Sequence, residues 1–154
     1  MPTYIPARQL STQCAEVIWR TLARSLMPAL QSWVHFTQRG FISGRIPGHG
    51  VIDIDTSGRI VSVLQPLGVL GLFDFSAAFP SISRSFIIFV MRAAGFPVWI
   101  ISMTSASWVG AKVVSDDGST AYEMHGGVGQ GCPAAAAAFV VGINPFISRL
   151  IRHY

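Results

Sequence analysis

One carboxylate, that of Asp74, stands directly after the apolar run of residues 69–73, in a chain that has few charges. An ionised carboxylate beside an apolar core is costly unless a cationic group or backbone donors hold it. At the end of a buried strand, such a group can bind Mg²⁺, which takes one or two carboxylates together with phosphate oxygens. The alternative is that Asp74 caps the next turn through nearby N–H groups. The position alone leaves both interpretations open.

A glycine-rich loop, HGGVGQG at residues 125–131, is a second candidate for binding chemistry. Its glycines would let backbone N–H groups approach a ligand closely, and a helix behind it would direct the positive end of its dipole at phosphate. The loop matches neither the dinucleotide-binding fingerprint nor the P-loop, so an ordinary hairpin-to-helix connection is the alternative. Gln130 can donate and accept hydrogen bonds at the edge of a base or sugar.

The other polar side chains of catalytic type form no recognisable site. Asp53 and Asp55 lie in a polar, glycine-flanked stretch that is typical of a solvated face. The four histidines lack the spacing of zinc ligands, and the sequence has no nucleophile elbow. Two cysteines give neither a disulfide framework nor a metal motif, which favours an intracellular location, nuclear or cytoplasmic.

The composition is that of a single, unusually apolar domain. Of 154 residues, 51% are hydrophobic and 12% are charged, against a typical charged share of roughly 25%. Such a chain is expected to pack against more protein. The apolar stretches 86–108 and 132–147 are interrupted or too short for a membrane span of about 20 residues, so we expect no membrane segment and no signal peptide. The net charge of +4 comes mainly from arginine, which suits a polyanionic partner.

The hydrophobic pattern predicts a mixed order of helices and strands. We expect a helix over residues 12–33 that Pro28 kinks or splits, a loop over 38–50, and strands at 61–64 and 69–73. Further along we expect a helix at 83–94, with Ser81 or Ser83 as its N-cap and Gly95 at its end, and a second helix at 98–108. A hairpin over 111–124 that turns at Asp117-Gly118 and a last helix that begins near Pro133 should follow.

Four blocks of the sequence, taken in order, resemble the motifs of one family. ARQLST at 7–12 resembles a fingers block written RPISL, and QRGFISGR at 38–45 resembles Q-x-x-F-x-x-G-R. LFDFSAAFPSI at 72–82 resembles the palm block D-x-S-x-A-F-D/P-x-[IV], and a GFP follows at 95–97. GGVGQGCP at 126–133 resembles G-V-R-Q-G-[CD]-P. The family is the reverse transcriptase domain of non-LTR, LINE-type retroelements.

The resemblance implies an α+β fold: the partial fingers-palm of a right-hand polymerase, with helices packed on a small antiparallel sheet. Residues 1–68 would be fingers-like and residues 69–154 palm-like. The implied reaction adds dNTPs to the 3′ end of a DNA primer on an RNA template with two Mg²⁺ ions. The Y-x-D-D hairpin and the thumb are not in this sequence, so we expect the isolated chain to be inactive. Its partners would include the remainder of that polypeptide.

The resemblance also assigns roles to single residues. Asp74 would be the catalytic carboxylate and first metal ligand, with the Phe75 carbonyl as a further ligand beside the nucleotide. Phe79 stands at the steric gate, where an aromatic ring clashes with a 2′-OH and so selects deoxynucleotides. The resemblance further implies that Arg8, Gln130 and Gly131 contact the dNTP. It also implies that Arg45 contacts the template.

Two functions from other classes remain as alternatives. The chain could be a non-catalytic remnant that binds nucleic acid through its arginines, in which case binding should weaken steeply with salt. It could instead be a poorly folding pseudogene fragment, because part of a palm sheet leaves apolar surface and an unpaired strand edge.

Overall fold

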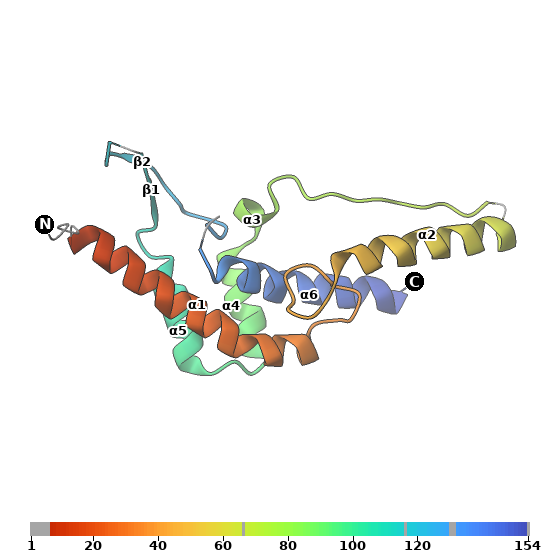
Figure 1. Cartoon of the computed structure of the whole chain (residues 1–154), viewed down its shortest axis with the longest axis horizontal. Coiled ribbons are helices and arrows are strands. Elements are labelled where there is room, and N and C mark those ends of the chain that lie inside the picture. The colour runs from red at the N-terminus through yellow and green to blue at the C-terminus, as the bar shows by residue number, and fades with distance from the viewer. Residues whose placement is uncertain (1–6, 66, 116, 130–131, 154) are drawn as a thin grey trace, which may run out of the picture.

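The computed structural model describes residues 7–65, 67–115, 117–129 and 132–153, and for residues 7–15 and 114 the backbone only. Within these ranges it has six helices and one two-stranded antiparallel sheet (Figure 1). In chain order the elements are α1 (Ala7–Trp33), α2 (Pro47–Leu64), α3 (Ala78–Ser81), α4 (Arg84–Ala93), α5 (Val98–Ser107), β1 (Lys112–Val114), β2 (Thr120–Glu123) and α6 (Ala135–His153). The expected α+β character is confirmed at this level.

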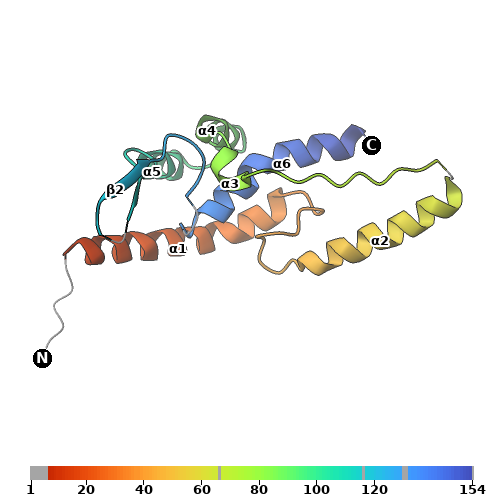
Figure 2. The ribbon, with the colours of Figure 1, turned by 90° about the horizontal axis from the view of Figure 1, so that it is seen from above.

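The core lies between helices, which corrects the expected packing of helices on the sheet. α6 packs against α4 and α1, and α4 packs against α5. The described side chains of β1 and β2 are exposed or half-buried, and the hairpin lies to one side of the helices (Figures 1 and 2). The core is formed by Leu30, Val34, Ile42, Ile87, Val90, Met91, Ile100, Ile101, Val128, Ala135, Ala137, Val140 and Val141.

Small residues on α6 let its neighbours come close. A Cβ on Gly142 would lie 2.4 Å from Cδ1 of Ile82 and 3.1 Å from Cγ1 of Ile87. Ala135 and Ala137, on the same helix, are buried. The alanine-rich stretch that opens α6 therefore serves packing, because short side chains allow short distances between helices.

The first helix agrees with the helix expected over residues 12–33. α1 begins at Ala7 and ends at Trp33, and Pro28 lies inside it without dividing it. In Figure 1 the axis of α1 turns toward its C-terminal end. A proline inside a helix favours such a turn, because it lacks an N–H donor and crowds the preceding turn.

The predicted strands at 61–64 and 69–73 are wrong. Residues 61–64 form the end of α2, which has Pro47 in its first turn, and residues 69–73 are extended but pair with no strand in the described ranges. Their β-branched and apolar residues are typical of a strand, but a strand also needs a hydrogen-bonded neighbour. Figures 1 and 2 show α2 and the returning segment 67–75 projecting beyond the core helices.

Short-range signals around α4 and the hairpin are confirmed. Ser83 is the N-cap of α4, and its Oγ accepts a hydrogen bond from the backbone N–H three residues later at 3.3 Å. Gly95 follows α4 with a φ of +76°. Between β1 and β2, Gly118 has a φ of +82° and Asp117 Oδ1 accepts a hydrogen bond from the Ser119 N–H at 2.8 Å.

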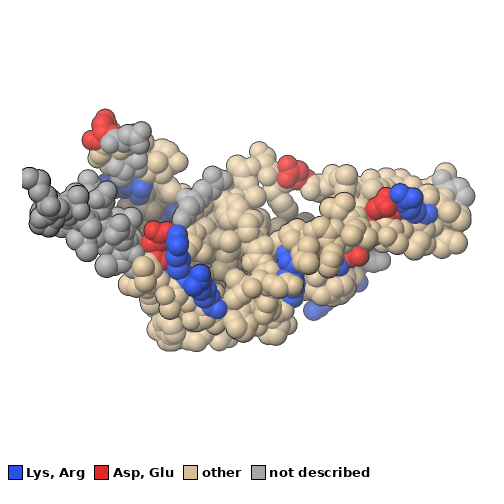
Figure 3. All heavy atoms as spheres, viewed as in Figure 1, with Lys and Arg blue, Asp and Glu red and all other residues tan. Residues whose placement is uncertain are grey.

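The chain exposes much more surface than a compact monomer of its size. Its accessible surface is 11197 Å² for a mass of 16.6 kDa, about 3,600 Å² more than the roughly 7,600 Å² of a compact globular protein of that mass. No described side chain of α2 is buried, and large apolar side chains of α2 and of residues 67–75 are exposed. Figure 3 shows a face that is mostly uncharged. Such a surface is typical of one that another polypeptide covers.

One helix within the described ranges, α6, is long and apolar enough to cross a membrane. It has 19 residues with a mean hydropathy of 1.3 in its most apolar window. The same length and composition occur in core helices of soluble proteins, and α6 packs against α4 and α1. The expectation that the chain has no membrane segment therefore stays a prediction.

Candidate functional site

Three segments that are far apart in the sequence meet at Phe79 in α3. The half-buried Phe79 ring stacks on Phe139 of α6 with centroids 4.8 Å apart, and the Phe41 ring meets it edge-on at 5.6 Å. The Phe79 carbonyl accepts a hydrogen bond from the Val128 N–H at 2.9 Å. The blocks 38–45, 72–82 and 126–133 thus share one contact centre.

The glycine loop lies directly against the backbone of α3. Gly127 has a φ of +65°, and a Cβ there would lie 2.3 Å from the Pro80 carbonyl oxygen. Both the left-handed conformation and the close approach require glycine at this position. Its neighbour Gly126 has nothing within 4 Å of a built Cβ. The tight contact therefore belongs to Gly127 and not to the loop as a whole.

Arg84, at the start of α4, holds the other side of the glycine loop. Its Nε donates to the Gly127 carbonyl at 2.7 Å, and its Nη1 donates to the carbonyls of Met124 at 2.8 Å and Trp108 at 3.1 Å. The guanidinium also lies over the Trp108 ring at 5.7 Å. Sequence reasoning did not single out this residue. A signal was present, since a basic side chain in the first turn opposes the helix dipole and needs another reason to be there.

Arg45 closes the block 38–45 onto the end of α1. Its guanidinium donates to four backbone carbonyls at 2.6 to 3.0 Å, those of Gln31, Val34, His35 and Gln38. Gln31 lies in the last turn of α1, whose carbonyls have no partner within the helix, and the other three carbonyls belong to the segment that follows α1. The template contact implied for Arg45 stays a prediction. It would have to share a guanidinium that the fold already uses.

The same block presents Phe41 to Phe79. Phe41 has a φ of +62°, which is uncommon for any residue other than glycine. The adjacent Ile42 is buried, and Gln38 is buried with its Oε1 lacking a hydrogen-bond partner in the described ranges. A strained residue persists only where its surroundings hold it, and such positions cluster at functional sites.

Asp74 lies on the exposed, extended segment that leads into α3. Within the described ranges, no hydrogen-bond donor or basic side chain contacts its carboxylate. The following turn is tied instead by Ser81, whose Oγ donates to the Ser76 carbonyl at 3.2 Å and whose N–H donates to the Ala77 carbonyl at 3.0 Å. Asp74 therefore does not cap this turn, and its carboxylate is accessible to a ligand.

Phe75 anchors the segment that carries Asp74. Its ring meets the ring of Phe146 on α6 edge-on, with centroids 6.1 Å apart. An apolar hollow of about 210 Å³ lies beside this contact, and Asp74 does not line it. The hollow is lined by Phe75, Ala78, Ser81, Ile82, Phe86, Phe139, Gly142, Ile143 and Phe146.

The oxygen donors at residues 74 and 75 fit Mg²⁺ only in part. A carboxylate and a backbone carbonyl, those of Asp74 and Phe75, are hard oxygen ligands of the kind that Mg²⁺ takes. In the described part of the chain, no group of three or more His, Cys, Asp or Glu side chains could surround a metal. An ion held here would need water, phosphate oxygens or further carboxylates to complete its coordination.

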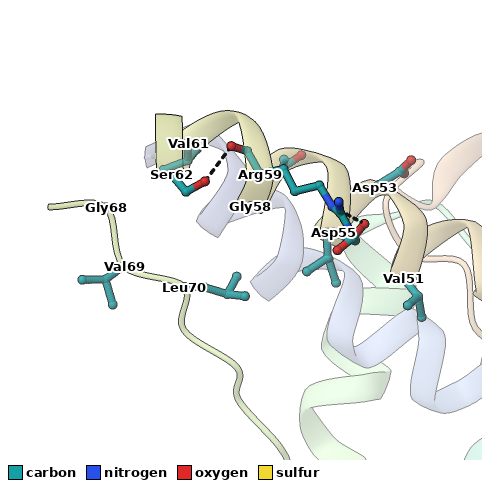
Figure 4. A pocket seen from close by; sticks show the side chains of 12 residues that line it. Val51, Asp53, Asp55, Gly58, Arg59, Val61, Ser62, Gly68, Val69 and Leu70 are labelled. Carbon is teal, nitrogen blue, oxygen red and sulfur yellow. Dashed lines mark hydrogen bonds and ion pairs between the residues drawn. The ribbon is translucent and has the colours of Figure 1, made fainter. Parts of the chain in front are cut away.

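The acidic side chains of α2 lie at a different place. Asp55 pairs with Arg59 at 2.9 Å, and Asp53 pairs with Arg39. Each carboxylate is thus in an ion pair with a different arginine. They border an open hollow of about 790 Å³ between α2 and residues 68–70 (Figure 4), whose lining does not include Asp74.

Three of the implied nucleotide contacts cannot be placed. Gln130 and Gly131 lie outside the described residues, and of Arg8 only the backbone is described, within α1. These assignments stay predictions.

No protein-family model matches the chain, and neither a curated protein nor a solved structure matches it. A functional assignment therefore depends on the residues and on their geometry.

Proposed function

We propose that the chain is the fingers-palm part of a non-LTR retroelement reverse transcriptase, with residues 1–68 fingers-like and residues 69–154 palm-like. The complete polypeptide adds dNTPs to a DNA primer on an RNA template. The observation that carries the proposal is the meeting of three of the four blocks at Phe79. Blocks that serve one nucleotide pocket must come together in the fold, whereas chance matches have no reason to do so.

In this proposal Phe79 is the ring that excludes a 2′-OH. Its ring has an aromatic neighbour on two sides, Phe139 and Phe41, and its carbonyl is bonded to Val128. A steric gate needs a ring held in place, because a mobile ring would yield to the extra hydroxyl. Gln130 and Gly131 follow in the same loop and would line the nucleotide.

Asp74 and the Phe75 carbonyl are the groups that would hold the metal. Bound Mg²⁺ would supply positive charge to the attacking 3′-OH and to the leaving pyrophosphate. The chain's own part is to present an accessible carboxylate at the entry to α3, on a segment anchored by the contact of Phe75 with Phe146. One carboxylate does not hold two ions at the geometry that in-line transfer requires, so the isolated chain should not extend primers.

Nucleotide binding by the purified chain tests this proposal. We expect Mg²⁺ to strengthen the binding of dATP, followed by tryptophan fluorescence, and Asp74→Asn to remove that strengthening. Asp55→Asn, which changes another exposed carboxylate, should leave it intact. Phe79→Ala should bring the affinities for dATP and ATP closer together. Equal dependence on Mg²⁺ in the wild-type chain and in Asp74→Asn would refute the assignment.

Nucleic-acid binding without catalysis is the second candidate. The net charge of +4 and the basic, aromatic surface described in the next subsection favour it. It predicts binding that weakens with salt and that persists in Asp74→Asn. Primer extension by the purified chain with Mg²⁺, abolished by Asp74→Asn, would contradict it. Either function would be carried out inside the cell, in the nucleus or the cytoplasm.

A further inference from the structure

A shallow hollow between α4 and the end of α5 gathers cationic, aromatic and hydroxyl side chains. It measures about 410 Å³. Its lining includes Arg84, Ser85, Phe89, Arg92, Ser105 and Trp108. Positions 85, 89 and 92 are three or four residues apart and so share one face of α4. The hollow has no lining residue in common with the apolar one beside Phe75.

The charge of this hollow is positive, and the groups that line it do not balance it. No carboxylate is among them. Arg92 is exposed and forms no ion pair in the part of the chain that the structure describes, and the three partners of Arg84 are neutral carbonyls. Glu123, next to one of those carbonyls in the sequence, pairs with Lys112 at 3.0 Å. Two arginines without a carboxylate favour an anionic ligand.

The aromatic rings add a second kind of chemistry. The Phe89 side chain is 65% exposed, with the Phe86 ring stacked at 6.4 Å. The half-buried Trp108 ring lies under the Arg84 guanidinium. A flat ring left in water beside cations is suited to stack on a base, since every base presents a π-face. Arg84 is already fixed by its carbonyl contacts, so little freedom is lost when it meets an anion.

We propose that this surface, made by Arg84, Phe89, Arg92 and Trp108, binds single-stranded nucleic acid. The arginines contact phosphates, and Phe89 stacks on a base. A free phosphate would use the cations alone and an apolar peptide the rings alone, whereas a strand of nucleotides uses both. The site does not depend on Asp74 or on metal. It therefore adds a nucleic-acid contact outside the proposed polymerase centre.

Fluorescence anisotropy of a labelled oligo-dT of about 12 nucleotides, titrated with the whole chain, tests the proposal. Phe89→Ala should weaken binding about 5- to 150-fold, with the salt dependence unchanged, and Phe89→Trp should restore binding. Arg92→Gln should weaken binding and reduce the slope of log affinity against log salt by about 0.7. The matched controls are Phe36→Ala, which removes a ring of similar exposure, and Arg152→Gln, which removes an exposed cation of α6; both should leave affinity and slope unchanged.

The outcomes separate this site from its alternatives. Equal losses in the controls would overturn it, because general charge or apolar contact would then explain the binding. A duplex of the same length that binds as tightly would also overturn it, since paired bases cannot stack on Phe89. If the wild-type chain does not bind oligo-dT at low salt, the proposal is also overturned. Asp74→Asn should bind oligo-dT as tightly as the wild-type chain does. The polymerase proposal is tested separately, by the effect of Mg²⁺ on dATP binding, so either proposal can fail without the other.

Discussion

Replacing Gly127 with alanine should separate the glycine loop from α3. At a φ of +65°, an alanine pays about 1–2 kcal/mol for the left-handed conformation. Its Cβ would lie 2.3 Å from the Pro80 carbonyl oxygen, which is backbone and cannot swing aside. The loop must therefore move, and the 2.9 Å hydrogen bond from the Val128 N–H to the Phe79 carbonyl is lost with it.

The size of the effect follows from these two terms. A buried backbone donor left without a partner costs about 1–3 kcal/mol, so Gly127→Ala should lower the free energy of unfolding by about 2–5 kcal/mol. Gly110 is the matched control, with a φ of +62° and nothing within 4 Å of a built Cβ. Gly110→Ala reports the conformational cost alone, about 1–2 kcal/mol. At Gly126 a Cβ would meet nothing within 4 Å and φ is not positive, so Gly126→Ala should change the free energy of unfolding by about 0.5 kcal/mol or less.

Urea unfolding followed by tryptophan fluorescence measures the three variants against the wild-type chain. Hydrogen exchange of the Val128 amide reports the local contact and should accelerate in Gly127→Ala only. If Gly127→Ala loses no more stability than Gly110→Ala and the Val128 amide stays protected, the loop does not lie against α3. The meeting of the sequence blocks at Phe79 would then be wrong, and the proposed function would lose its main support.

Three further substitutions test other parts of the fold. Ser83→Ala should lower the free energy of unfolding by about 1 kcal/mol because it removes the N-cap of α4, and Ser83→Asp should keep the cap; equal loss in both would contradict this. Arg45→Gln should lower the free energy of unfolding in urea by about 2–4 kcal/mol. Arg45→Lys should not restore the lost stability, because an ammonium lacks the planar fork of a guanidinium that reaches several carbonyls. Arg24→Gln, at an exposed position of α1, should leave the free energy of unfolding almost unchanged. The hydrogen bond and the charge of Lys112 hold the pKa of Glu123 below its ordinary value, so the pair stabilises the hairpin at neutral pH and this contribution is lost as pH falls through the lowered pKa. Lys112→Gln should raise the Glu123 pKa in an NMR titration, and an unchanged titration would disprove the pairing.

Features that depend on a few neighbouring residues could be predicted. The N-cap Ser83, the turn at Asp117-Gly118 and the first helix depend on side chains within a turn of one another. The strand expected at 69–73 failed for the opposite reason, since a strand is completed by a neighbour that local pattern cannot supply. The same holds for 61–64, where helix α2 simply continues.

In the candidate site, too, some residues could be predicted from the sequence and the contacts of others could not. Asp74 and Phe79 could be singled out from the order of the blocks, but the sequence left open whether Asp74 caps its own turn. In the described ranges no donor contacts the Asp74 carboxylate, and Ser81 ties the turn instead. The partners of Arg84 and Arg45 could not be predicted from the sequence, because they are backbone carbonyls whose residue type carries no signal.

By itself, the order of residues determined that the chain combines helices with a hairpin, the short turns and caps, and the excess of apolar side chains. Only the tertiary structure decided that the core lies between helices, that residues 67–75 stay exposed, and that Phe41, Phe79, Phe139 and Val128 meet. The reason is physical: capping and turn formation are settled within a few residues, whereas burial and ring stacking depend on which distant segments the chain brings together.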